Sequence, residues 1–105
     1  MPAETHVGRD RLGPDDVVTC VRFNTAEVLE LDDVEIDLGA RLADDLGADE
    51  LALIDLVEAI EEELGERTVG FAIDDDDLAD VTTVGDLVEV VSARLERARD
   101  QAEHA

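Results

Sequence analysis

The sequence predicts an all-α fold, a small four-helix bundle of three main helices plus a short third one, with a long loop after the first helix. Two series of aliphatic residues recur at i, i+3, i+4, i+7 and i+11, which places each series on one face of a helix. No segment alternates polar and apolar residues for long enough to predict a strand. Hydrophobic residues make up 45% of the chain and aromatic residues only 2%, so we expect a core of Leu, Val, Ile and Ala side chains.

The chain of 105 residues is in the size range of one domain. Residues 1–13 combine charged residues with two glycines and show no periodicity, which predicts a disordered N-terminal arm. The helical domain is expected over residues 14–97, and residues 98–105 are interpreted as a C-terminal tail.

The first helix is expected to begin near Pro14, because Asp15 and Asp16 supply the acidic first turn that the helix dipole favours. It is predicted to run to Leu31, and residues 32–47 follow as a long ordered loop. The apolar residues of this loop, whose leucines are expected to turn inward, are Val34, Ile36, Leu38, Leu42 and Leu46.

The second helix is predicted to start after Asp49, a residue suited to cap a helix N-terminus, and to cover residues 51–64. Leu51 and Ile54 lie off the core-facing stripe of this helix and are candidates for contact with a partner; the alternative is that they pack under the preceding loop. The core-facing stripe consists of Leu53, Leu56, Val57, Ile60 and Leu64.

Gly65 ends the second helix, and a short helical turn is expected within residues 73–81, through Leu78. Thr82 or Thr83 is predicted to cap the last helix. The apolar face of that helix consists of Val84, Leu87, Val88, Val91 and Leu95.

The net charge of −22 comes from 30 acidic residues against eight arginines. A charge of this sign and size argues against nucleic acid or an anionic membrane as a partner, and it favours basic protein surfaces. The alternative is that the acidic residues only keep the protein soluble.

Metal and redox chemistry have little support in the sequence. Cys20 is the single cysteine, so no internal disulfide can form, and we interpret it as a small core or boundary residue. The two histidines lie near the chain ends and form no Cys/His cluster. The acidic run at residues 74–77 does not continue as an EF-hand loop, since Ala79 and Gly85 stand where glycine and glutamate are needed. No metal site is predicted beyond weak screening by divalent cations.

No apolar run approaches the roughly 18 residues of a membrane span, and the N-terminus lacks a signal pattern. A cytoplasmic protein is expected. The helical region also contains no histidine beside a nucleophile, and its carboxylates lie on faces expected to be solvated, so an enzyme is not predicted.

One stretch carries a specific resemblance. Residues 42–64 read LADDLGADELALIDLVEAIEEEL, which resembles the central motif of acyl carrier proteins, DLGADSL followed by an acidic aliphatic helix. Further on, the residues from Ile73 to Asp75 and from Val81 to Gly85 look like the short third helix and the TTV opening of the fourth helix in that family. The resemblance covers about residues 15–96, with about five extra residues near 66–70.

The resemblance implies a 4'-phosphopantetheine arm on the serine that follows the aspartate, but Glu50 stands there, between Asp49 and Leu51. A carboxylate would form a mixed anhydride, which water destroys, so no cofactor is expected as the sequence stands; the arm is expected only if position 50 were serine. Ser92 lies deep in the last helix and offers no replacement. Structurally, an acid in the first turn of a helix is favourable by ~0.3 to 1 kcal/mol.

The resemblance also implies that the second helix recognises basic surfaces of biosynthetic enzymes or of a regulatory protein. Glu58 departs from the family, where an apolar residue is common at this place. Glu63 is a further acidic residue of the same helix and of the same implied recognition surface. The expected partner-binding residues are Asp49, Glu50, Leu51, Ile54, Asp55, Glu58, Glu61 and Glu62.

Three functional hypotheses follow. The first is a monomeric carrier-fold module that lacks the phosphopantetheine serine and acts through protein contacts in fatty-acid or polyketide-type biosynthesis. The second is a genuine acyl carrier protein whose native serine at position 50 has been replaced. The third is an acidic protein that buffers cations.

Overall fold

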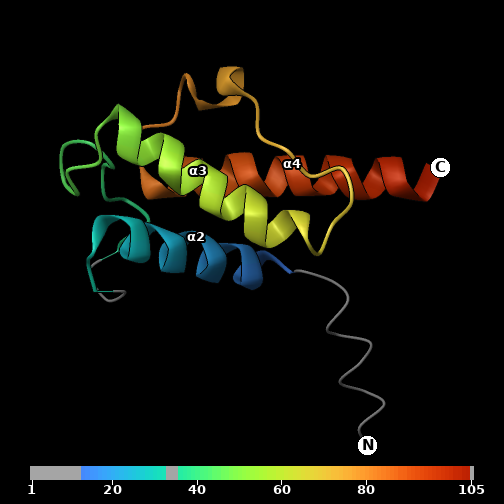
Figure 1. The fold of residues 1–105 in the computed structure, drawn as a ribbon, viewed down its shortest axis with the longest axis horizontal. Coiled ribbons are helices and arrows are strands. Elements are labelled where there is room, and N and C mark those ends of the chain that lie inside the picture. Colours follow the sequence, from blue (N-terminus) through green and yellow to red (C-terminus); the bar gives the residue numbers. More distant parts are fainter. Residues whose placement is uncertain (1–12, 33–35, 105) are drawn as a thin grey trace, which may run out of the picture.

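The computed structural model describes residues 13–32 and 36–104, and this part of the chain is helical (Figure 1). It contains the α-helices α2 (Pro14–Leu29), α3 (Glu50–Gly65) and α4 (Val84–His104) and the short 3-10 helix η2 (Asp75–Leu78). Helix α2 packs against both α3 and α4 and runs in the opposite direction to them (Figure 1). The predicted all-α class is confirmed, while the expected short third helix is a single 3-10 turn.

The core is aliphatic, as predicted, and is shared by the three α-helices. On α3 the predicted stripe is buried except for Leu53, which is half-buried. On α4 the predicted stripe is buried except for the half-buried Val88. Phe71, in the loop after α3, adds one ring to this core, whereas Phe23 on α2 is 50% exposed. The aliphatic residues with no exposed surface are Val21, Leu56, Ile60, Val84, Leu87 and Val91.

Helix α2 ends two residues before the predicted end at Leu31. Glu30 adopts the left-handed conformation, with φ of 57° and ψ of 48°, and this ends the regular hydrogen-bond pattern. The backbone N–H of Leu31 then donates to the carbonyl of Ala26 at 2.8 Å. At the other end, the backbone N–H of Gly13 donates to the Asp16 carboxylate at 2.8 Å. The rest of the predicted N-terminal arm, residues 1–12, lies outside the described residues.

The loop between α2 and α3 is attached to the start of α4 by three backbone hydrogen bonds. Leu42 N–H donates to the Thr82 carbonyl at 2.9 Å, Val84 N–H to Ala40 at 3.0 Å, and Gly85 N–H to Leu38 at 2.7 Å. A Cβ at Gly85 would lie 3.1 Å from the Leu38 carbonyl oxygen, so this close approach favours glycine. The two segments form an isolated antiparallel bridge, and no strand occurs in residues 13–32 and 36–104.

The leucines of this loop do not all turn inward. Ile36 and Leu42 are buried and Leu46 is half-buried, but Leu38 is 44% exposed. The expectation for Leu38 is wrong because its backbone faces Gly85, which leaves the side chain at the edge of the bundle. Val34 lies outside the described residues.

Helix α4 continues to His104, so residues 98–104, which the sequence analysis assigned to a tail, are helical. Ala98 is only 3% exposed and joins the core cluster. This boundary was placed too early because Ala98 follows Leu95 at helical spacing and no glycine or proline interrupts the segment. Within the described residues, no helix is both long and apolar enough to cross a membrane.

Two leucines of α3 provide a matched test of this packing. Leu56 is fully buried and Leu51 is 68% exposed. We expect Leu56→Ala to lower the free energy of unfolding by about 2 to 5 kcal/mol, because it leaves a cavity. Leu51→Ala should change it by no more than about 0.5 kcal/mol. Urea unfolding followed by circular dichroism measures both, and similar losses for the two variants would contradict the described burial.

Candidate functional site at the start of α3

The start of α3 is fixed by a capping interaction that the sequence predicted. The Asp49 carboxylate accepts a hydrogen bond from the backbone N–H of Ala52 at 2.8 Å, and the Asp49 carbonyl accepts one from Leu53 at 2.9 Å. Before the cap, Gly47 adopts a positive φ of 75°, which turns the chain toward the helix. Glu50 is therefore held as the first residue of α3, with its side chain exposed.

An exposed stripe runs along α3 on the side away from the core. Its five residues recur at i, i+3, i+4, i+7 and i+11, the same spacing as the core-facing stripe. The apolar members are 68% and 46% exposed, so they do not pack under the preceding loop. The stripe is apolar near the helix start and acidic further along. We call it the α3 outer face, and it consists of Leu51, Ile54, Asp55, Glu58 and Glu62.

Two acids of α3 that were expected on the recognition surface are engaged elsewhere. Glu61 is half-buried, and its carboxylate accepts a hydrogen bond from the backbone N–H of Ile73 at 2.8 Å. Glu63 accepts a hydrogen bond from the Asn24 side chain of α2 at 3.1 Å. Both carboxylates hold neighbouring segments against α3.

Cys20 lies in the same α2–α3 contact and is buried, as expected for a core residue. The Asn24 amide donates to the Cys20 carbonyl at 2.8 Å and to its sulfur at 3.4 Å. Burial, together with the nearby Glu63 carboxylate, raises the pKa of the Cys20 thiol to about 12. The thiol therefore stays protonated at neutral pH and is a poor nucleophile.

A cavity of about 200 Å³ lies beside the first turns of α3. No pattern in the sequence marks this cavity, because its walls come from three separate segments that the bridge to α4 brings together. The side chains that line it include Arg41, Leu42, Ala48, Leu53, Val81 and Thr82.

Thr83 caps α4 as predicted, in a reciprocal arrangement with Asp86. The Thr83 hydroxyl accepts a hydrogen bond from Asp86 N–H at 3.0 Å. The Asp86 carboxylate accepts from the backbone N–H groups of Thr82 and Thr83 at 2.9 and 3.0 Å. These backbone donors lower the pKa of Asp86. Thr82 contributes only its N–H to the cap, and its side chain lines the cavity beside α3.

The comparisons with known proteins give the family. The family model described as a phosphopantetheine attachment site matches residues 21–91. This chain belongs to that family, which includes the acyl carrier proteins. The acyl carrier protein of Thermotoga maritima is 37% identical over 81 residues, which cover 77% of this chain and 94% of that protein. The acyl carrier protein of Clostridium perfringens is 38% identical over 72 residues, covering 69% and 88%. That of Petrotoga mobilis is 35% identical over 81 residues, covering 77% and 89%.

Acyl carrier proteins are carriers and not enzymes, and they work by contacting biosynthetic enzymes. The expectation that this family member is not an enzyme is therefore confirmed. Within residues 13–32 and 36–104, no group of three or more His, Cys, Asp or Glu side chains could hold a metal ion.

The start of α3 does not fit a stored phosphopantetheine in this family member. Glu50 presents a carboxylate, and an acyl phosphate formed on it would be hydrolysed. Two of the described hydroxyl groups are used in the fold: the Thr25 hydroxyl donates to the Val21 carbonyl at 2.7 Å, and the Thr83 hydroxyl caps α4. Ser92 is half-buried within α4.

Asp77 and Asp86 make the stability of this acyl carrier family member depend on pH in the same direction. The side-chain hydrogen bond from Arg94 lowers the pKa of Asp77, and backbone N–H donors lower that of Asp86. Because the folded pKa values lie below the unfolded value of about 3.9, their stabilisation is present above pH ~4 and is lost as the pH falls through the folded pKa values.

Repulsion among the other carboxylates decreases as the pH falls from 7 toward the sequence pI of 4.1. We therefore expect the melting temperature to rise between pH 7 and about 5 and to fall below about pH 4. The fall should be smaller in Asp77→Asn than in the control variant Glu27→Gln. Thermal unfolding across this pH range measures the effect, and a melting temperature that keeps rising down to pH 3 would contradict it.

Proposed function

We propose that this chain is a carrier-fold protein that holds no phosphopantetheine arm and acts through protein contacts in fatty-acid or polyketide-type biosynthesis. The observation that carries the proposal is the exposed carboxylate of Glu50 at the first position of α3, where the resemblance to acyl carrier proteins implies a serine. The capped helix and the exposed α3 outer face remain, so the surface that would meet a partner is retained while the attachment chemistry is absent.

The composition of the α3 outer face defines the kind of partner that it fits. Leu51 and Ile54 offer an apolar contact beside the helix start. The exposed carboxylates of Asp55, Glu58 and Glu62 continue the stripe. A complementary partner surface has a small apolar patch next to a row of Lys or Arg side chains. Asp49 contributes the cap rather than a direct contact, and Glu61 is occupied by the Ile73 backbone.

The exposed carboxylate of Glu50 adds a further feature to this surface. It places a fixed negative charge near the position where the family bears a phosphodiester. A partner that senses this charge could dock without a prosthetic arm on the module. A monomer in the cytoplasm fits this role, because its docking face stays available to basic enzymes.

The second candidate function is a genuine acyl carrier protein in which Glu50 replaces a native serine. The intact cap at Asp49 supports this second candidate, because a serine at position 50 would be presented in the first turn of a well-formed helix. The two candidates differ in the chemistry of one residue, so they can be separated by one substitution.

The attachment chemistry is tested with coenzyme A and a phosphopantetheinyl transferase of broad specificity. We expect no mass gain on the unchanged protein, because a carboxylate cannot hold a stable phosphodiester. Glu50→Ser should gain one phosphopantetheine group. Intact-protein mass spectrometry measures both, with Glu50→Ala as the control for the loss of charge. A mass gain on the unchanged protein, mapped by peptide analysis to Thr82 or any other residue, would refute the proposal.

The docking surface is tested by surface plasmon resonance against a ketoacyl synthase and a phosphopantetheinyl transferase from the same host. We expect Leu51→Asn, and separately Asp55→Asn with Glu58→Gln, to weaken binding at least about tenfold, or 1.4 kcal/mol. Added salt should weaken binding of the unchanged protein.

The matched control for the charge variant is Glu27→Gln with Glu66→Gln, which removes the same charge from exposed positions outside the α3 outer face. This control should bind like the unchanged protein. Equal weakening by the two charge variants would show that only net charge matters and would contradict a defined docking face.

A further inference from the structure

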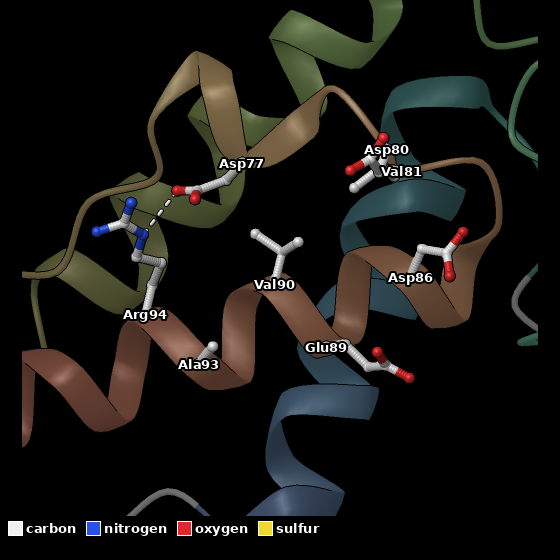
Figure 2. A pocket seen from close by; sticks show the side chains of 8 residues that line it. All are labelled: Asp77, Asp80, Val81, Asp86, Glu89, Val90, Ala93 and Arg94. Atoms are coloured by element: carbon white, nitrogen blue, oxygen red, sulfur yellow. Dashed lines mark hydrogen bonds and ion pairs between the residues drawn. The ribbon is translucent and has the colours of Figure 1, made fainter.

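A second surface feature lies between the η2 segment and α4, away from the α3 outer face. Arg94 of α4 joins the two elements. Its Nε donates to the Asp77 carboxylate at 2.6 Å (Figure 2), and an Nη donates to Asp74 at 2.9 Å. Beside this contact is an open groove of about 320 Å³. We call it the η2–α4 groove, and besides Asp77 and Arg94 at one end it is lined by Asp80, Val81, Asp86, Glu89, Val90 and Ala93.

The floor of the groove is aliphatic. Val90 projects from α4 into the space beneath the η2 segment, and Val81 stands at the end opposite Arg94 (Figure 2). Val81 and Val90 are half-buried, and both pack on the edge of the core. An aliphatic floor of this kind can support a chain of methylene groups lying on the surface.

The carboxylates around the groove fall into two groups. Asp77 is bound to Arg94, and Asp86 is bound to the backbone of Thr82 and Thr83. The side chains of Asp80 and Glu89 are exposed and make no hydrogen bond or ion pair with residues 13–32 and 36–104. Two carboxylates at the rim are thus available to a ligand.

An apolar floor with an acidic rim is complementary to a long basic side chain. Such a side chain lays its methylene stem on aliphatic surface and keeps its charged head among carboxylates. The protein already contains one example. The Arg94 side chain is only 22% exposed, and its guanidinium forms ion pairs with two carboxylates at the end of the same groove. A bare metal ion would gain nothing from the floor, and two of the four nearby carboxylates already have partners.

We propose that the η2–α4 groove binds an arginine side chain presented by a partner protein. The proposal rests on the proposed function in that a partner protein supplies the arginine, and it adds a contact built from η2 and α4. The stem packs on Val81 and Val90, and the guanidinium lies between Asp80 and Glu89. This contact fixes the orientation of a partner that the α3 outer face alone would leave free to rotate.

The groove is tested on the whole chain with n-butylguanidinium, which has the stem and head of arginine and needs no partner. Methyl signals in NMR spectra report on the floor. We expect saturable shifts at the methyl groups of Val81, Val90 and Ala93. Guanidinium, which lacks the stem, and n-butanol, which lacks the charge, should each bind more weakly at matched ionic strength.

Variants distinguish binding in the groove from non-specific attraction to the acidic surface. Asp80→Asn with Glu89→Gln should weaken binding about two- to fivefold, as expected for exposed ion pairs. Val90→Phe should abolish the saturable shifts by filling the groove while leaving every charge in place. The double variant Glu27→Gln with Glu66→Gln should bind like the unchanged protein, since it removes the same charge elsewhere.

The proposal is overturned if the shifts are absent, if they spread over the acidic surface without saturating, or if guanidinium binds as well as n-butylguanidinium. It is also overturned if the two charge variants weaken binding equally. None of these results depends on Glu50 or on phosphopantetheine. If n-butylguanidinium does not bind in the groove, the proposed function is unaffected. If the proposed function is wrong, the binding experiment still tests the groove.

Discussion

The position of the candidate site depends on the two backbone hydrogen bonds of Leu42. Its N–H donates to the Thr82 carbonyl just before α4, and its own carbonyl accepts from Ala48 N–H just before the cap of α3. The side chain of Leu42 is buried, so the residue cannot move without disturbing the core. Leu42 therefore connects the segment that leads into α3 with the segment that leads into α4, although Glu50 and Thr83 stand 33 positions apart in the sequence.

The acidity of the chain has two separate roles in the structure. Some carboxylates are part of the architecture because they accept backbone N–H groups: Asp16, Asp49 and Asp86 do so at helix starts. Glu61 of α3 does so by binding the loop that follows the helix. These bonds stabilise the fold against the repulsion that a net charge of −22 creates. Other exposed carboxylates lie on the α3 outer face and at the rim of the η2–α4 groove, where we propose that a basic partner binds.

Local patterns in the sequence predicted the parts of the fold that local interactions determine. The two aliphatic stripes, the Asp49 cap and the Thr83 cap were all recognisable, because helix periodicity and capping involve residues at most four apart. The exposure of Leu51 and Ile54 followed from the same periodicity.

The features that were missed depend on contacts between distant segments. The outward position of Leu38 follows from its contact with Gly85, and the occupation of Glu61 and Glu63 follows from contacts with Ile73 and Asn24. The cavity beside α3 and the η2–α4 groove also combine residues from separate segments, so no spacing rule marks them in the sequence.

The absence of an attached arm is the central claim, and the protein purified from its own cells tests it most directly. There, every native transferase has had access to the chain. Intact-protein mass spectrometry should give the mass of the unmodified polypeptide, allowing for removal of the first methionine. A species heavier by one phosphopantetheine, on any residue, would contradict the account and make this protein a working acyl carrier.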